Sequence, residues 1–155
     1  MKAYYQSPVG LLEIQDADRC IVSLRVVETG EYIAKPLTDV LEQAILQLTE
    51  YFAGKRINFD LPIKQSGTDF QKKAWDYLST IPYGNTVSYK EEAIAIGSPK
   101  GSRAVGSANG KNNIAIIVPC HRVINESGSL GGYAYGLDMK KFLLRLEQQK
   151  DKRLF

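Results

Sequence analysis

Residues 114–123 read Ile-Ala-Ile-Ile-Val-Pro-Cys-His-Arg-Val, an apolar run that stops at a proline and leads directly into a cysteine and the only histidine of the chain. Five consecutive apolar residues predict a buried strand that ends just before Cys120. A thiolate is the nucleophile of cysteine chemistry, and a nearby base or positive charge favours it. Because neighbours in a strand point to opposite faces, we expect His121 to act on Cys120 through a bridging water or through a twist of the backbone. The stretch therefore indicates a nucleophilic thiol.

A plainer interpretation of this stretch stays open. An isolated cysteine beside a strand often serves only as a small buried apolar residue. That interpretation holds more strongly for Cys20, the second cysteine, which we expect to be structural.

Upstream, two short helices are predicted around a small-residue turn. Ser88 is a good N-cap for a helix over residues 89–96, and Glu91 completes a capping box with it. Residues 97–99, Gly-Ser-Pro, form a turn into a second, basic helix over about residues 99–108. Such a pair is typical of a helix-turn-helix. Many small helical pairs share the pattern, so by itself it identifies no function.

The remaining elements predict an α+β fold in two parts, 1–63 and 66–150. The first part has strands at residues 1–5, 11–15 and 20–27, a helix over residues 36–52 and an extended stretch at residues 57–63. Thr68 caps a helix at the start of the second part. Residues 125–135 are rich in Gly and Ser and predict a loop, and a closing helix spans residues 137–149.

The composition of the 155 residues, 44% apolar and 24% charged, is that of a globular protein. No apolar run approaches the roughly 18 residues of a membrane-spanning helix. Residues 1–10 have one Lys and no apolar core, so we expect no signal peptide. Two cysteines a hundred residues apart make no disulfide framework, so we expect a cytoplasmic protein. One histidine and two cysteines cannot supply four zinc ligands of the usual kind. We expect no metal and no cofactor.

Charge is unevenly distributed along the chain. Residues 1–64 carry a net charge of −2, whereas residues 65–155 carry +5. Residues 99–125 contain four basic side chains and no acidic one. Such a field suits a polyanion such as nucleic acid, although a basic face can also arise by chance.

Taken together, the motifs resemble the O6-alkylguanine-DNA alkyltransferases, also called methylated-DNA–protein-cysteine methyltransferases. Residues 119–123, Pro-Cys-His-Arg-Val, are similar to the active-site motif of that family. Residues 84–89 and 102–106 resemble its helix-turn-helix region, residues 131–133 its substrate loop, and residues 143–147 its closing helix. The similarity is specific from about residue 70 to 147. Before residue 65 it is one of size and pattern alone.

The resemblance implies direct repair of DNA. An alkyl group passes irreversibly from O6 of guanine to Cys120, once per molecule, and O4-alkylthymine is left open as a second substrate. His121 would be the base, Glu147 would orient it, and Asn112 would hold the cysteine loop. The target base must leave the duplex to be reached. Tyr89, Val123, Tyr133 and Ala134 would form its pocket, with Tyr89 also assisting the rotation of the base.

The family's helix-turn-helix enters the minor groove, and Arg103 matches the arginine that fills the gap left by the flipped base. The small residues Ala104, Gly106 and Ser107 would allow close approach to the groove, with Lys100 beside them. The implied partner is double-stranded DNA that contains O6-alkylguanine. We expect the protein to bind it as a monomer and not to bind a membrane. Residues 1–63 would form a structural, ribonuclease H-like domain.

Two positions depart from the family pattern. Ala134 stands where some members have a serine that contacts O6, and Tyr135 stands where many have glycine. The first change widens the pocket and the second narrows its entrance, so the preferred size of the adduct is left open.

Three other functions compete with repair. A damage-recognition protein of the alkyltransferase-like kind would usually replace the cysteine with tryptophan, and Cys120 argues against it. A helix-turn-helix regulator with a sensor cysteine would need a ligand or dimerisation domain, which residues 1–65 do not offer. A cysteine hydrolase would turn over an ester or amide. We expect the repair alkyltransferase.

Overall fold

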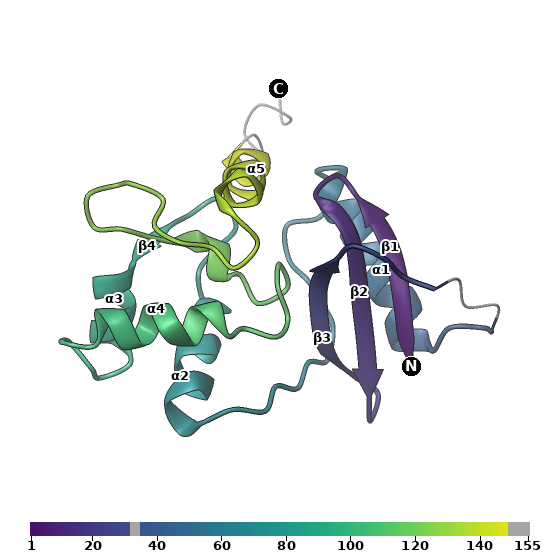
Figure 1. Ribbon diagram of the computed structural model, residues 1–155, viewed down its shortest axis with the longest axis horizontal. Coiled ribbons are helices and arrows are strands. Elements are labelled where there is room, and N and C mark those ends of the chain that lie inside the picture. The colour runs from purple at the N-terminus through teal and green to yellow at the C-terminus, as the bar shows by residue number, and fades with distance from the viewer. Residues whose placement is uncertain (32–34, 149–155) are drawn as a thin grey trace. The chain divides into compact units, whose positions relative to one another are not determined.

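The computed structural model describes residues 1–31 and 35–148 and divides into two compact units (Figure 1). The first unit comprises residues 1–65 with residues 113–115. The second comprises residues 66–112 and the chain from residue 116 onward. A small antiparallel sheet and five α-helices make up the fold, which confirms the α+β class expected from the sequence.

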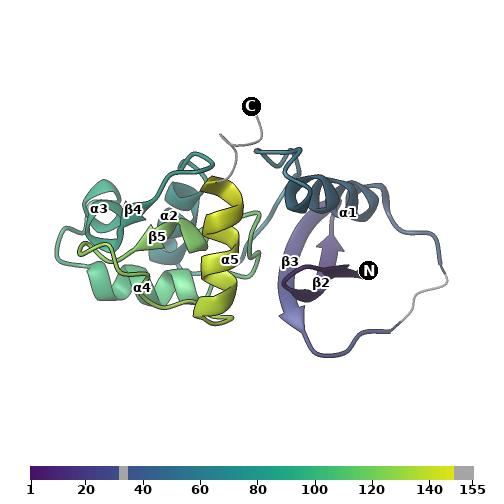
Figure 2. The same cartoon turned by 90° about the horizontal axis from the view of Figure 1, so that it is seen from above.

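The first unit is a three-stranded antiparallel meander with one helix. Strands β1 (Lys2–Ser7), β2 (Gly10–Ala17) and β3 (Cys20–Val27) lie in sequential order. The turn between β2 and β3 places Asp18 and Arg19 at φ 51° and 64°, the left-handed region that two-residue hairpin loops require. Helix α1 (Asp39–Phe52) runs along the sheet and buries Leu41 and Leu48 completely (Figure 2). Burying this apolar face is what stabilises a helix on a sheet.

The outer edge of β3 is covered by two other segments of the same unit. Backbone hydrogen bonds of 2.8–3.0 Å join Ile21 to Pro62 and Lys64, and Leu24 to Asn113 and Ala115. They pair backbone groups that an uncovered edge strand would expose to other chains. The extended stretch predicted at residues 57–63 contains no β-strand. Its one pairing is an isolated bridge between Ile63 and Ile21.

The second unit consists of four helices, a short 3₁₀ turn and a two-residue parallel ladder. Its helices are α2 (Asp69–Leu78), α3 (Tyr89–Ala95), α4 (Ser102–Gly110) and α5 (Leu137–Gln148). The 3₁₀ turn η1 (Cys120–Arg122) leads into β5 (Val123–Ile124), which pairs with β4 (Val87–Ser88). Trp75 ties α2 to α4, since its indole N–H donates to the Ala108 carbonyl at 2.8 Å.

The predicted helix starts are confirmed at both capping residues. Thr68 and Ser88 accept hydrogen bonds from the backbone N–H groups of Gln71 and Glu91, and both form complete capping boxes. The second helix of the pair starts at Ser102, three residues later than expected, and extends to Gly110. The closing helix is described to Gln148, and the predicted ends at residues 149 and 150 lie outside the described residues.

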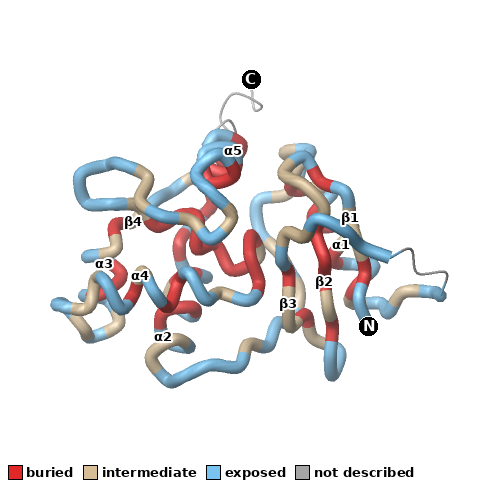
Figure 3. Tube along the Cα trace, in the orientation of Figure 1, coloured by how far each residue is buried: buried red, intermediate tan, exposed pale blue. Residues whose placement is uncertain are grey.

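The strand predicted at residues 114–118 is wrong. Only Ile114 forms a bridge, and the chain then turns, with Ile116 at φ 70°. The segment is nonetheless buried except for the half-buried Ile117; Figure 3 colours the whole chain by burial. A short apolar run signals burial, and burial alone does not distinguish a strand from a packed turn. Here the Asn112 side-chain amide donates to the Val118 carbonyl at 2.8 Å and stabilises the turn.

Within the described part of the chain, no helix is both long enough and apolar enough to cross a membrane.

Candidate active site

Cys120 is the first residue of η1 and is 9% exposed. Its backbone N–H donates to Val118 at 2.9 Å, and the N–H of Arg122 donates to Pro119 at 3.0 Å. These two bonds make a tight turn of the Pro-Cys-His-Arg motif rather than the end of a strand. His121 consequently projects into the interior of the unit, where it is fully buried.

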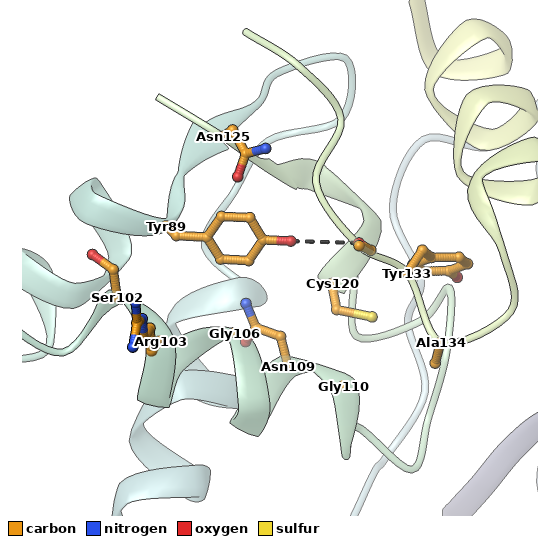
Figure 4. Close-up of a pocket in the computed structure, with 11 residues that line it drawn as sticks. Tyr89, Ser102, Arg103, Gly106, Asn109, Gly110, Cys120, Asn125, Tyr133 and Ala134 are labelled. Carbon is orange, nitrogen blue, oxygen red and sulfur yellow. Dashed lines mark hydrogen bonds between the residues drawn. The ribbon is translucent and has the colours of Figure 1, made fainter. Parts of the chain in front are cut away.

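A cavity of about 520 Å³ opens beside Cys120 (Figure 4). This volume lies in the range of small-molecule sites, and its walls come from α3, α4, η1 and the loop before α5. The lining residues are Tyr89, Ser102, Arg103, Gly106, Asn109, Gly110, Cys120, Asn125, Gly132, Tyr133 and Ala134. Six of them were predicted from the sequence: Cys120, Tyr89, Arg103, Gly106, Tyr133 and Ala134.

Behind the cysteine lies a buried group of three charged or polar side chains. His121 Nε2 is 2.7 Å from Glu147 Oε2, and both side chains are almost completely buried. Arg122 donates to both carboxylate oxygens, from Nε at 2.8 Å and from a terminal nitrogen at 3.1 Å. Burial opposes the charged carboxylate, but His121 and Arg122 prevail and lower the pKa of Glu147 to about 2. Glu147 is therefore a fixed anion at neutral pH.

The contact with Glu147 determines the tautomer of His121. A carboxylate only accepts hydrogen bonds, so Nε2 must carry a proton that it donates. In the neutral ring, Nδ1 is then the basic nitrogen. This atom is buried and has no hydrogen-bond partner among the described residues. The arrangement supplies an oriented base one residue from the thiol.

The electrostatics of Cys120 differ from the sequence expectation that nearby positive charge favours the thiolate. Burial is the largest effect and raises the pKa of the thiol above its ordinary value. A hydrogen bond from Asn112 and the charge of Lys140 act in the opposite direction without prevailing. The resting sulfur is therefore a thiol, and its proton has to be removed during any reaction.

Tyr89 and the loop that contains Gly131 and Gly132 form one wall of the cavity. The Tyr89 hydroxyl donates to the Gly132 carbonyl at 3.4 Å, drawn as the dashed line in Figure 4. Gly131 has a φ of 70°, and an added Cβ would lie 2.9 Å from the Tyr89 ring. Tyr133 lies beyond Cys120, with its ring edge-on to Tyr135 at 5.9 Å between centroids. Burial raises the pKa of the Tyr133 phenol, whose oxygen has no described partner.

The other predicted residues lie outside the cavity lining. Val123 is fully buried in β5, and Asn112 braces the turn before the cysteine. Lys100, Ala104 and Ser107 are exposed, the last two on α4. Arg103 is also exposed and stands on α4 at the rim of the cavity.

Lys140 also belongs to the site, although it was not predicted from the sequence. Its ammonium group is completely buried and donates to the carbonyls of Val123, Leu130 and Gly132 at 2.5–2.9 Å. It also lies 5.7 Å from the centre of the Tyr89 ring. Burial lowers the pKa of Lys140 to about 8, against the influence of Cys120. Its position on the apolar face of α5, between Met139 and Leu143, was an available signal.

Replacing Lys140 with methionine should destabilise the loop over residues 125–135. The buried Val123 carbonyl and the partly buried carbonyls of Leu130 and Gly132 would lose this donor, and we expect the free energy of unfolding to fall by about 2–4 kcal/mol. Urea denaturation measures this loss. Lys141→Met is the matched control because Lys141 is the exposed neighbour on the same helix. Equal stability of the two variants would contradict the role assigned to Lys140.

Comparison with known proteins adds independent findings. The family model described as "6-O-methylguanine DNA methyltransferase, ribonuclease-like domain" matches residues 1–65, and that described as "6-O-methylguanine DNA methyltransferase, DNA binding domain" matches residues 69–149. A methylated-DNA–protein-cysteine methyltransferase of Methanosarcina barkeri is 46% identical over 149 residues, which cover 92% of this chain and 94% of the relative.

Two solved structures are similar over almost the whole chain. Mycobacterium tuberculosis OGT in complex with DNA is 45% identical with a TM-score of 0.86, covering 95% of this chain and 92% of the other. An O6-methylguanine DNA methyltransferase from Methanococcus jannaschii is 30% identical with a TM-score of 0.70, covering 94% and 93%.

The fold and the site define a two-unit protein in which a buried thiol lines a cavity and is followed by a histidine–carboxylate pair. Because the two family models together match almost the entire chain, the protein belongs to the 6-O-methylguanine DNA methyltransferase family. Among residues 1–31 and 35–148, no three His, Cys, Asp or Glu side chains are grouped so that they could hold a metal ion.

Proposed function

We propose that this protein repairs DNA by moving an alkyl group from O6 of guanine to Sγ of Cys120, once per chain. The observation that carries the proposal is the position of Cys120. Its sulfur lies at a cavity large enough for a nucleobase, next to an oriented histidine. The DNA-bound state of the Mycobacterium tuberculosis relative supports DNA as the partner.

The proposed reaction forms a sulfur–carbon bond as the bond between the alkyl carbon and O6 breaks. Burial keeps Cys120 protonated at rest, so the proton must leave as the sulfur attacks. We assign its removal to His121 Nδ1, acting through a bridging water, while Glu147 holds the ring and stabilises the imidazolium. The electron pair of the broken bond remains on guanine, which takes up a proton. The thioether has no leaving route, so the protein acts once.

The pocket would receive the alkylated base after it has rotated out of the duplex. Tyr133 offers an aromatic surface for stacking, and the backbone of Cys120 and Ala134, which line the cavity, would contact the base edge. We expect the backbone of Val123, just behind the lining, to contact it as well. Tyr89 would assist the rotation and donate to the ring nitrogen N3. Its hydroxyl is already within the cavity, where Gly132 is its only acceptor among the described residues.

We propose that α3 and α4 act as a helix-turn-helix that enters the minor groove. The exposed face of α4 carries Arg103, Ala104 and Ser107, and the small side chains would permit close approach of the helix. Lys100 would contact phosphate. Arg103 would occupy the space left by the flipped base, which its place at the cavity rim favours.

Replacing Arg103 with alanine should separate duplex repair from the chemistry. With the arginine gone, nothing offsets the unstacking of the base, so we expect repair in duplex DNA to slow by about tenfold to a hundredfold. Reaction with free O6-benzylguanine needs no flipping and should change far less. Single-turnover rates on both substrates measure the difference. Equal losses of rate on the two substrates would refute the proposed role. A wild-type rate of duplex repair in Arg103→Lys would show that only the positive charge at this position matters.

The two units would divide the work. Residues 66–150 would form the DNA-binding and alkyl-acceptor domain, and residues 1–63 a structural domain of the ribonuclease H-like kind. We expect the protein to act as a monomer in the cytoplasm, without a cofactor. One thiol, one base and one cavity suffice for the reaction, and all of them lie in the second unit.

Intact-protein mass spectrometry after incubation with an O6-methylguanine oligonucleotide tests the function directly. We expect one methyl group per chain, mapped to Cys120 by peptide analysis, together with restored guanine in the DNA. An unmodified protein that still binds the lesion would instead support a damage-recognition module. Continuous release of product from an ester or amide would support a cysteine hydrolase.

A further inference from the structure

A second buried carboxylate lies near the active site, and the proposed mechanism does not use it. Glu92 on α3 is completely buried, and Asn109 on α4 is 6% exposed. The Asn109 side-chain N–H donates to Glu92 Oε1 at 2.7 Å. No basic side chain forms an ion pair with Glu92 in the described part of the chain. The carboxylate is therefore buried without a counter-charge.

Two atoms of this pair lack partners. Glu92 Oε2 and Asn109 Oδ1 are both buried, and neither has a hydrogen bond to any described residue. Each buried polar atom left unpaired costs about 1–3 kcal/mol. An ionised carboxylate cannot relieve either cost because both atoms are acceptors. A single proton on Oε2 would give Asn109 Oδ1 a donor and pair the carboxylic acid with the amide through two reciprocal hydrogen bonds.

Asn109 connects this pair to the active site. It lines the same cavity as Cys120 and Tyr89. Asn109 also stands on α4, the helix proposed to approach DNA, and Glu92 on α3 joins the two helices through it. A negative charge on Glu92 raises the pKa of Cys120 and of Tyr89, although burial has the larger effect on both. The protonation state of Glu92 therefore affects the pKa of the Cys120 thiol.

We propose that Glu92 is a positioning residue for alkyl transfer: as a neutral acid it pairs with Asn109 through two hydrogen bonds, which hold the amide in the cavity wall and keep negative charge away from Cys120. The inference rests on the proposed function. Ionisation of Glu92 breaks one of the two bonds, leaves an unpaired anion under the pocket and disfavours the thiolate. Transfer then slows as pH rises.

The titratable side chains on the elements packed against Glu92 show why burial dominates its pKa. Strands β4 and β5 carry no titratable side chain, and the only one on α4 is Arg103, which is exposed. Helix α2 contributes Tyr77, whose pKa is raised by burial and by the charges of Glu91 and Glu92. The remaining titratable side chains of α2 are exposed: Asp69, Lys72, Lys73 and Asp76. On α3 itself, Glu91 and Lys90 are exposed, and Lys90 lies 3.7 Å from Glu126. Burial, opposed by the Asn109 hydrogen bond, raises the pKa of Glu92 to about 7.

Glu92→Gln isolates the effect because glutamine makes both hydrogen bonds to Asn109 and does not ionise. Single-turnover methyl transfer from an O6-methylguanine duplex would be measured from pH 5.5 to 8.5 in the wild type and in E92Q. Taking the ratio of the two rates removes every pH effect that the two proteins share. We expect the E92Q rate relative to wild type to be constant below about pH 6. It should rise up to about tenfold by pH 8, because a group with a pKa of about 7 is then mostly ionised.

Glu91→Gln is the matched control, since it removes one charge from an exposed position of the same helix. Its rate ratio to wild type should stay flat, and a flat ratio for E92Q would overturn the inference. Carbon-13 NMR of the glutamate carboxyls provides a second measurement that needs no activity. A titration near pH 7 that disappears in E92Q is expected, and its absence from the wild type would also overturn the inference. If no variant transfers methyl while this titration is present, the proposed function fails instead.

Discussion

Replacing Cys120 with alanine will abolish alkyl transfer altogether. The reaction needs a sulfur at the cavity to form the thioether, and among the described residues the only other cysteine is Cys20, in β3 of the first unit. Alanine removes the nucleophile and leaves the cavity, α4 and Arg103 in place. Binding to a duplex that contains O6-methylguanine should therefore persist, as measured by fluorescence anisotropy.

Cys20→Ala is the matched control for this experiment. It removes the other thiol, which is half-buried and has no part in the proposed mechanism. Mass spectrometry should find one methyl group on C20A and none on C120A. Residual transfer by C120A, or loss of transfer in C20A, would remove the basis for assigning Cys120 as the acceptor.

Replacing Glu147 with glutamine should damage both stability and rate. Arg122 would remain buried without its bidentate carboxylate, and removing one partner of a buried ion pair costs about 3–5 kcal/mol. His121 would lose the anion that stabilises its protonated form, so we expect transfer to slow by about a hundredfold. Denaturant unfolding and single-turnover kinetics measure the two effects. Asp138→Asn, an exposed carboxylate on the same helix, should change neither.

The lowered pKa of Glu147 predicts how the free energy of unfolding depends on pH. Its pKa is about 2 in the folded protein against an ordinary value of 4.5, so the unfolded chain takes up the proton first on acidification. The stability that this carboxylate contributes is complete above about pH 4.5 and is lost as pH falls toward 2. E147Q should lack this part of the acid dependence. An unchanged acid transition in E147Q would contradict the buried pairing.

Local signals in the sequence predicted local structure well. Thr68 and Ser88 mark helix starts because a short polar side chain followed three residues later by Gln or Glu satisfies free backbone N–H groups at that point. No distant residue is needed for such a bond. The first three strands were likewise predictable from their own residues and turns.

Features that depend on distant partners were not predictable from pattern. Residues 114–118 read as a strand, yet the distant backbone of Leu24 bonds to Ala115, and the nearby side-chain amide of Asn112 bonds to Val118. The ladder between β4 and β5 has two residues per strand and joins segments far apart in the chain. The position of Lys140 on the apolar face of α5 signals burial, but the sequence does not show the three carbonyls in β5 and the following loop that accept its hydrogen bonds.

The sequence by itself determined the class of fold, the helix starts capped by Thr68 and Ser88, and the family to which the Pro-Cys-His-Arg motif belongs, because these follow from residues adjacent in the chain. Only the tertiary structure decided how the site behaves chemically. Burial keeps Cys120 protonated. Glu147 on α5 orients His121 in η1, and Glu92 on α3 pairs with Asn109 on α4, so each contact joins separate elements. Desolvation and pairing depend on what surrounds a group in space, and that environment exists only once the chain has folded.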